Sequence, residues 1–324
     1  MAMSSFDKKK HSMSNSDTNF PINVNHINKS YGNGKITAVN DVSFQVNKGE
    51  IFGLIGPDGA GKTTIFRILT TLLKPDSGNA SVDGFDVVRD FKAIRQRVGY
   101  MPGKFSLYQD LTVEENLTFF ATVFNTTIEE NYDLIKDIYK QIEPFKTRKA
   151  GALSGGMKQK LALSCALIHK PSVLFLDEPT TGVDPVSRKE FWEILKKLKE
   201  QGITILVSTP YMDEATLCDR IALIAEGKIL KIDTPENMVR QFGASLWSVQ
   251  SNDMYKLLKD IRQFPNVKSC FAFGDSHHVT FKSEPISTNE LESFLIEKGH
   301  TNINIHPTQP KIEDCYMNLD LEKH

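Results

Sequence analysis

The stretch EIFGLIGPDGAGKTT, residues 50–64, places a short apolar run directly before a glycine-rich loop. Residues 56–63 match the pattern G-x-x-x-x-G-K-[ST] at every fixed position. An apolar run that ends in glycine is typical of a buried parallel strand, and we expect a helix from Gly61 to about Leu73. A strand, a glycine loop and a helix in this order predict a cradle for the phosphates of a nucleotide.

The loop residues have distinct expected roles toward the phosphates. Glycine lets the backbone curl so that successive N–H groups point inward, and Lys62 brings a positive charge to the terminal phosphates. Thr63 is expected to bind Mg²⁺, and Thr64 to reach an inner phosphate. The alternative, a glycine-rich turn with Lys62 on the surface, is disfavoured by the flanking strand and helix. The nucleotide-binding residues predicted here are Gly56, Pro57, Asp58, Gly59, Ala60, Gly61, Lys62, Thr63 and Thr64.

Two acidic residues follow a second apolar run, VLFLDE at residues 173–178. Four apolar residues place Asp177 at the carboxyl end of a buried strand, where ligands bind in open α/β sheets. We expect Asp177 to hold Mg²⁺ together with Thr63, and Glu178 to orient or deprotonate an attacking water as the catalytic residue. Asp-Glu before proline is also common in turns, so the pair indicates a metal and catalytic site only in combination with the phosphate cradle.

A third glycine motif starts the segment LSGGMKQKLALSCAL, residues 153–167. Ser154 is expected to cap a helix, and the N–H groups of Gly155 and Gly156 would form another anion site. One chain has no evident use for a second anion site, so we expect these three residues to act on the nucleotide of another subunit. A simple N-cap is the alternative for this segment taken alone.

The pattern along the chain predicts an α/β fold. Strands alternate with helices around the motifs, which indicates a mainly parallel sheet with an N-terminal antiparallel β-subdomain and a helical insertion at about 103–168. After Gly243 a βαββαβ order predicts a small ferredoxin-like α+β module. The expected parts are a disordered tail at 1–20, one domain at 21–243 and an accessory domain at 244–324. Further strands are expected at 22–30, 37–47 and 94–101.

The composition and charge of the chain favour some classes of function over others. The 324 residues carry 39 basic and 40 acidic side chains, a formal net charge of −1, which gives no support to a nucleic-acid surface. No apolar run has the length of a membrane-spanning helix, so action on a membrane is expected to need another chain. His277 and His278 are expected on opposite faces of a strand edge, where they would not share a metal. The cysteines are widely spaced and predict reduced thiols, at Cys165, Cys218, Cys270 and Cys315.

Together, GPDGAGKTT and LSGGMKQKLALSCALIHKPSVLFLDEPTTGVDP resemble the nucleotide-binding domain of ABC transporters, over about residues 22–243. The resemblance is closest to multidrug and antibiotic exporters whose membrane subunits are separate chains. It implies an ATPase with ATP and Mg²⁺ as cofactors, and it implies that Tyr31 stacks on adenine, the alternative being a core or turn tyrosine. It also places residues 182–184 at an interface where two such domains enclose two ATP molecules, each between one chain's cradle and the other chain's Ser154.

The resemblance further implies partners and location. The partners would be integral membrane permease subunits and a second ABC ATPase, in a homodimer or a heterodimer, with no nucleic acid. The location would be cytoplasmic and peripheral on the inner face of the cell membrane. The transported compound would be drug-like or lipophilic, and its identity cannot be read from this chain because the permease selects it.

Two positions depart from the family pattern. After the strand VGYMP the family usually has a glutamine that touches Mg²⁺ and the attacking water, whereas this chain has Gly103, and Gln109 comes six residues later. After ITILVST the family has a histidine at the γ-phosphate, whereas this chain has Pro210, which has no donor. Losing one transition-state donor costs about 3–4 kcal/mol, so we expect slow hydrolysis with ATP binding retained.

Three alternatives stay open at this point. The first is a regulatory ATP-binding half of a heterodimeric pair with little turnover, which Gly103 and Pro210 keep open. The second is a soluble ABC-type ATPase that acts on DNA or the ribosome, although such proteins usually carry coiled-coil insertions or tandem domains. The third is a P-loop kinase, a class that lacks the LSGG segment.

Overall fold

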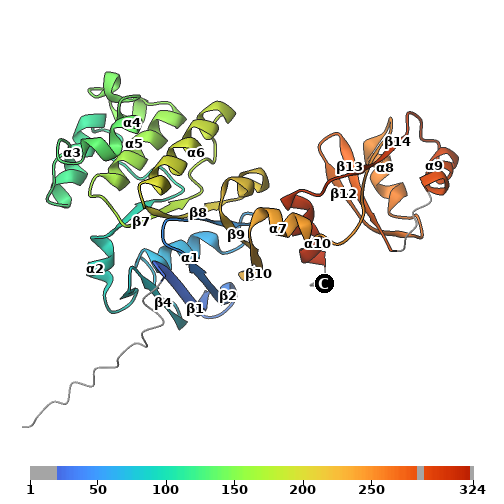
Figure 1. The fold of residues 1–324 in the computed structure, drawn as a ribbon, viewed down its shortest axis with the longest axis horizontal. Coiled ribbons are helices and arrows are strands. Elements are labelled where there is room, and N and C mark those ends of the chain that lie inside the picture. The colour runs from blue at the N-terminus through green and yellow to red at the C-terminus, as the bar shows by residue number, and fades with distance from the viewer. Residues whose placement is uncertain (1–19, 283–287, 322–324) are drawn as a thin grey trace, which may run out of the picture. The chain divides into compact units, whose positions relative to one another are not determined.

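The computed structural model describes residues 20–282 and 288–321 (Figure 1). The chain divides into two compact units that meet between Asp233 and Thr234. The boundary expected at 243/244 comes about ten residues later than this, because α7 (Pro235–Arg240) belongs to the second unit, where it packs on α10 (Ile312–Leu321). The disordered tail expected at 1–20 lies, apart from Phe20, outside the described residues.

The first unit opens with an antiparallel sheet in the order β2-β1-β4-β5. Its first two strands confirm the two that the sequence predicted, and β2 buries Val42, Phe44 and Val46 on one face. The sequence did not predict β4, because its first half is polar and begins in the turn chemistry around Gly78. The bounds are β1 Ile22–Tyr31, β2 Ile36–Val46, β4 Ser77–Val82 and β5 Phe85–Asp86.

The second sheet of this unit has the strand order β10-β9-β3-β8-β7-β6, and all neighbours are parallel except β10 with β9. Every residue of β3, β7 and β8 is buried, as expected for parallel strands covered on both faces. The bounds are β3 Ile51–Ile55, β6 Val98–Met101, β7 Val173–Asp177, β8 Thr204–Thr209, β9 Arg220–Ala225 and β10 Lys228–Asp233. The predicted α/β class is confirmed.

The strand order brings the two acidic residues beside the glycine loop. β8 lies between β3 and β7, so that Ile55 pairs with Thr209 and Asp177 pairs with Ser208. The chain leaves β3 into the glycine loop and leaves β7 at Glu178. Both exits therefore lie at the same edge of the sheet, one on each side of the end of β8.

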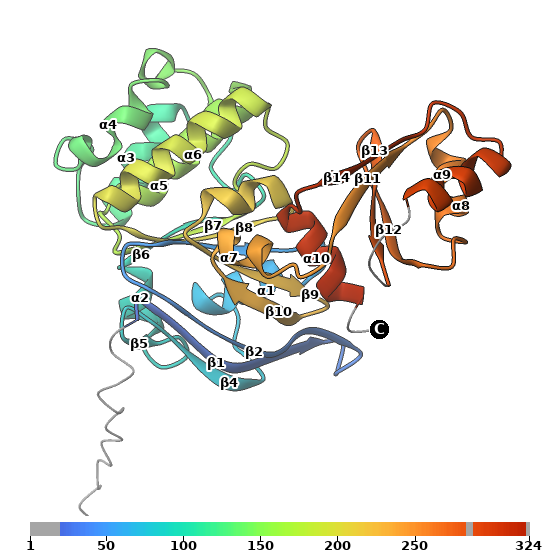
Figure 2. The same ribbon diagram turned by 45° about the vertical axis from the view of Figure 1, so that its right-hand side comes forward.

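Helices cover this sheet and form the insertion (Figures 1 and 2). A capping box begins α3, because Thr112 Oγ1 accepts from the Glu115 N–H and Glu115 Oε2 accepts from the Thr112 N–H. The bounds are α1 Lys62–Leu69, α2 Phe91–Arg95, α3 Val113–Val123, α4 Tyr132–Tyr139, α5 Gly155–Leu167 and α6 Pro185–Glu200, with short 3₁₀ turns η2 Glu143–Phe145, η3 Ala150–Ala152 and η4 Met212–Leu217.

The strand expected at 94–101 is wrong over its first half. Residues Phe91–Arg95 form α2, and β6 begins only at Val98. Arg95 fixes this helix, because its side chain donates to both Oγ1 and the carbonyl oxygen of Thr71. Ile94 is buried on the inner face of this helix, which explains why an apolar residue occupies the position.

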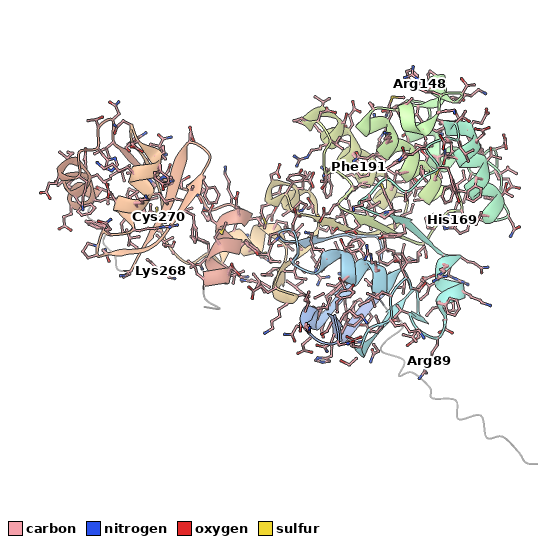
Figure 3. All side chains as sticks on the ribbon, turned by 180° about the vertical axis from the view of Figure 1, so that it is seen from behind. Arg89, Arg148, His169, Phe191, Lys268 and Cys270 are labelled. Atoms are coloured by element: carbon pink, nitrogen blue, oxygen red, sulfur yellow. The ribbon has the colours of Figure 1, made fainter. Side chains whose placement is uncertain are left out.

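The second unit contains an antiparallel sheet in the order β12-β13-β11-β14, which is the ferredoxin-like arrangement that βαββαβ predicted. Its core is formed by the sheet and two helices, and Cys270 of β12 lies in it (Figure 3). The four cysteines are all buried, and none of them forms a disulfide. The bounds are β11 Leu246–Gln250, α8 Met254–Ile261, β12 Val267–Phe273, β13 Ser276–Phe281, α9 Thr288–Glu297 and β14 Asn304–Thr308.

The expectation that His277 and His278 lie at a strand edge is wrong. Both are buried on β13, an interior strand of the sheet. A nitrogen of His277 contacts the Met254 carbonyl at 2.6 Å, whereas Nδ1 of His278 lies 2.7 Å from Oδ1 of Asp314. The two imidazoles are thus held by α8 and by α10, and the described residues contain no group of three or more His, Cys, Asp or Glu side chains able to hold a metal ion.

Candidate functional site

The glycine loop between β3 and α1 requires glycine for two different reasons. A Cβ at Gly56 would lie 2.2 Å from the Ile224 carbonyl oxygen, and a Cβ at Gly61 would lie 2.2 Å from the Ala38 carbonyl oxygen. Gly59 and Gly61 also have φ of 81° and 101°, a region that disfavours side chains. The backbone therefore curls against its neighbours in a way that few other residues permit.

Lys62 lies inside this curl. Its side chain is 2% exposed, and Nζ donates to the carbonyl oxygens of Gly56 at 2.8 Å and Pro57 at 3.0 Å. Nζ also lies 3.2 Å from Oε1 of Glu178. A buried ammonium that is held at the mouth of a helix N-terminus is suited to an anionic group such as a phosphate.

Thr63 and Asp177 meet beside Lys62. The Thr63 hydroxyl donates to Oδ1 of Asp177 at 3.3 Å, although the two residues are 114 positions apart in the chain. A hydroxyl and a carboxylate are the hard oxygen ligands that Mg²⁺ prefers when phosphate supplies the remainder. The donor set therefore fits Mg²⁺. The two predicted metal ligands lie close to the predicted catalytic Glu178 at the glycine loop, and their roles stay predictions.

Tyr31 lies next to the same loop. It ends β1, it is 36% exposed, and its hydroxyl lies 3.3 Å from Oγ1 of Thr64. The ring is therefore held beside the first turn of α1 with part of its surface in solvent. This is the arrangement that a platform for a base needs, and it argues against a core tyrosine.

The LSGG segment lies on the surface at the start of α5. Ser154 caps the helix by accepting from the Met157 N–H at 3.4 Å, and both Ser154 and Gly155 are exposed. A Cβ at Gly155 would lie 3.8 Å from the Gly182 carbonyl oxygen, so the segment adjoins residues 182–184. Asp184 caps α6 through the N–H groups of Val186 and Ser187.

The two positions that depart from the family pattern each follow a strand of the central sheet, β6 before Gly103 and β8 before Pro210. A Cβ at Gly103 would lie 3.0 Å from the Asp177 carbonyl oxygen and 3.8 Å from Cβ of Glu178. Pro210 follows β8 directly, next to the residue that pairs with Ile55. Gln109 does not replace the missing glutamine, because it packs against Gly151 of the helical block.

A buried carboxylate that no sequence motif indicated, Glu214, lies next to the site. Glu214 is 2% exposed and accepts three hydrogen bonds, from Thr209 at 2.6 Å, Thr180 at 3.0 Å and Arg188 at 3.0 Å. It joins the segment after β7 to the segment after β8. Two hydroxyl residues at the end of an apolar strand, Ser208-Thr209, were the signal that could have shown a polar cluster here.

Burial affects the pKa of two groups on or beside β6. Burial, with the negative charge of Asp177 as a further cause, raises the pKa of Tyr100 to about 12. Burial lowers the pKa of His169, whose Nε2 lies 3.1 Å from the Val98 carbonyl oxygen.

Known proteins share these features. The ABC transporter family model matches residues 39–181. The chain is 39% identical over 302 residues to the probable multidrug ABC transporter ATP-binding protein YbhF of Escherichia coli, with 92% of this chain and 52% of YbhF covered. It is 37% identical over 309 residues to the linearmycin resistance ATP-binding protein LnrL of Bacillus subtilis, with 92% and 97% covered. The chain belongs to the ATP-binding proteins of ABC transporters.

A solved ABC transporter cassette supports the fold of the first unit. The dimeric structure of MJ0796, a bacterial ABC transporter cassette, matches with a TM-score of 0.60 and 27% identity over 66% of this chain and 98% of that chain. The family that the motifs predicted is thus confirmed. The chain spans about half the length of YbhF. Among the described residues, none of the helices combines the length and apolar character that crossing a membrane requires.

Proposed function

We propose that this ABC protein binds Mg²⁺–ATP and, as one of two ATPase subunits, powers the export of a drug-like or lipophilic compound through a separate permease. The observation that carries the proposal is the meeting of Lys62 with Glu178 and of Thr63 with Asp177 around the glycine loop. The relatives YbhF, a probable multidrug ABC transporter ATP-binding protein, and LnrL, a linearmycin resistance ATP-binding protein, support this class of compound.

ATP would enter with its phosphates in the loop and its adenine against Tyr31. The phosphates would take the place that the loop carbonyls and Glu178 now hold around Lys62 Nζ. Thr63 would turn its hydroxyl from Asp177 to Mg²⁺, with Asp177 supporting the ion. Glu178, freed from Lys62, would orient the attacking water.

The exposed Ser154 segment supports an active dimer. The N–H groups at the start of α5 have the geometry of an anion site, and Ser154 and Gly155 are exposed, with Gly155 beside Gly182. In the proposed dimer these residues contact the γ-phosphate of the ATP that the partner binds. The solved relative MJ0796 is described as a dimer, which favours this arrangement.

An apolar groove beside the helical block is the proposed contact with the permease. It has a volume of about 360 Å³ and is lined from β6, α3 and α5, with His169 at its wall (Figure 3). The aromatic side chains of Tyr108 and Phe119 are exposed on the same block. Apolar surface of this kind is typical of an interaction site, and a permease at this groove would make the chain peripheral on the cytoplasmic face of the membrane.

The second candidate is a regulatory ATP-binding half of a heterodimer. Gly103 and Pro210 favour it, because neither offers a side-chain donor to the attacking water or the γ-phosphate. In that arrangement the intact Ser154 segment would complete the site of a partner ATPase that has both missing groups. Hydrolysis at this chain's own loop would then be slow.

Nucleotide binding tests the proposal. Calorimetry with the full chain should detect Mg²⁺–ATP, and Lys62→Ala should abolish the signal, because a buried cation that holds the phosphates is removed. Lys189→Ala, which deletes an exposed lysine of α6, is the matched control and should bind as the wild type does. An affinity that Lys62→Ala leaves unchanged would contradict the proposed site.

A further inference from the structure

The strand β8 ends in two hydroxyl side chains, Ser208 and Thr209, directly after the apolar residues 205–207. Neither residue has any exposed surface. A hydroxyl that is buried to this degree is normally hydrogen-bonded, because it has given up its contacts with water. Consecutive side chains of a strand point to opposite faces, so the two hydroxyls have different neighbours.

Ser208 contacts both carboxylate residues of the nucleotide site. Its Oγ donates to Oδ1 of Asp177 at 2.7 Å and accepts from the N–H of Glu178 at 3.0 Å. The carbonyl oxygen of Ser208 accepts from the same N–H at 3.1 Å. The bond to Asp177 is shorter than the one from Thr63, which is 3.3 Å.

The backbone of Glu178 needs such support. Its φ is 51°, in the left-handed region that a residue with a Cβ adopts only when its surroundings fix it. The two acceptor atoms of Ser208 hold the Glu178 N–H in this conformation. The side chain of Glu178 then reaches Nζ of Lys62 at 3.2 Å.

The departures from the family pattern make Ser208 more important in this chain. Gly103 has no side chain, and Pro210 has no donor. In the part of the chain that the structure describes, Ser208 is the side chain outside the glycine loop and α1 for which a hydrogen bond to Asp177 is seen. Thr63 would leave Asp177 when it binds Mg²⁺, and Ser208 would remain.

We propose that Ser208 is a positioning residue for this site, an inference that rests on the proposed function. Its hydroxyl holds the Asp177 carboxylate for Mg²⁺. Its two acceptor atoms hold Glu178 in the conformation that faces the phosphates. Ser208 does not touch ATP and acts through these two residues.

Thr209 provides a matched control. It has the same burial at the same strand end, but its Oγ1 donates to Oε2 of Glu214 at 2.6 Å, on the other face. Glu214 keeps its bonds from Thr180 and Arg188 when this one is lost. Thr209→Val therefore deletes a buried hydroxyl without removing a contact to Asp177 or Glu178.

The test measures how Mg²⁺ changes nucleotide binding in the full chain. A fluorescent N-methylanthraniloyl ATP is bound first in EDTA and then at increasing MgCl₂, with wild type, Ser208→Ala, Ser208→Thr and Thr209→Val. Ser208→Ala should raise the Mg²⁺ concentration for half-maximal tightening about 10- to 100-fold, as loss of a partner of a metal ligand does. Binding in EDTA, which depends on Lys62, should stay close to wild type.

The other variants distinguish a positioning role of Ser208 from a general effect on the stability of the fold. Ser208→Thr keeps the hydroxyl and should restore the Mg²⁺ dependence, and Thr209→Val should retain it. Thermal unfolding of each variant reports whether the fold is intact. An unchanged Mg²⁺ dependence in Ser208→Ala, or an equal loss in Thr209→Val, would overturn the inference. A wild-type chain that binds no analogue would overturn the proposed function itself.

Discussion

Nζ of Lys62 lies 3.2 Å from Oε1 of Glu178, so the lysine that should bind phosphate is paired with the carboxylate that should activate water. The Lys62 side chain is 2% exposed, and its two other partners are loop carbonyls. The Lys62 ammonium has three N–H donors, and Glu178 and the two carbonyls occupy them, so an incoming phosphate would compete with Glu178 for this group. We therefore expect ATP binding and release of Glu178 to be coupled.

Glu178→Gln should separate binding from hydrolysis. The variant removes the negative charge that competes with phosphate for Lys62, so ATP should bind more tightly than in the wild type. It also removes the general base, which typically contributes about 10²- to 10⁴-fold, so any hydrolysis should fall by that order. Fluorescent ATP binding and phosphate release measure the two effects. Weaker ATP binding in this variant would contradict the coupling.

Tyr31→Ala should weaken ATP binding by loss of a stacking surface. Stacking of a base on an aromatic ring contributes about 1–3 kcal/mol, which is about fivefold or more in affinity. Tyr31→Phe is the control, because it keeps the ring and loses the hydroxyl that lies 3.3 Å from Thr64 Oγ1. Calorimetry with ATP and with inorganic triphosphate distinguishes the roles, since triphosphate has no base. An equal loss for both ligands would indicate a structural role for Tyr31.

Pro210→His should accelerate ATP hydrolysis by the chain. The position follows β8 directly, beside the end of the strand that leads into the glycine loop, and a histidine there supplies a donor that proline lacks. Restoring one transition-state donor is worth up to about 10²- to 10³-fold. Because residue 103 remains glycine, we expect a smaller gain of about tenfold. A fast wild-type rate that the substitution leaves unchanged would show that the site is not impaired.

The sequence predicted the site better than it predicted the smaller elements. The glycine loop, Asp177 and Glu178 carry fixed chemistry at fixed spacing, and parallel strands bring their ends to one edge of a sheet. The start of α2 was missed because Arg95 fixes it by a tertiary contact to Thr71. The role of Ser208 was not predicted, because a serine at the end of a strand indicates a function only once the strand pairing places it beside Asp177.

The stability of the chain should depend on pH through His169. Burial lowers its pKa in the folded state below 6.5, so the unfolded chain takes up a proton more readily. This contribution to stability is complete above pH 6.5 and is lost as the pH falls through the folded-state pKa. The free energy of unfolding, measured with urea, should therefore fall less between pH 7.5 and pH 5.5 in His169→Gln than in the wild type. His306→Gln, at an exposed histidine, should behave as the wild type.

Mixing two inactive variants tests whether Ser154 acts on the partner's ATP. Lys62→Ala has no working loop but keeps its Ser154 segment, and Ser154→Arg keeps the loop but blocks the segment. If the site is shared between two copies, each variant alone should fail to dimerise with ATP, whereas the mixture should form dimers with one complete site. Sedimentation in the presence of Mg²⁺–ATP measures dimer formation. Both chains also carry Glu178→Gln, because this substitution should suppress hydrolysis. Dimers of Ser154→Arg alone would show that the segment does not contact the partner's nucleotide. A wild-type chain that stays monomeric would instead indicate that the second ATPase is a different protein.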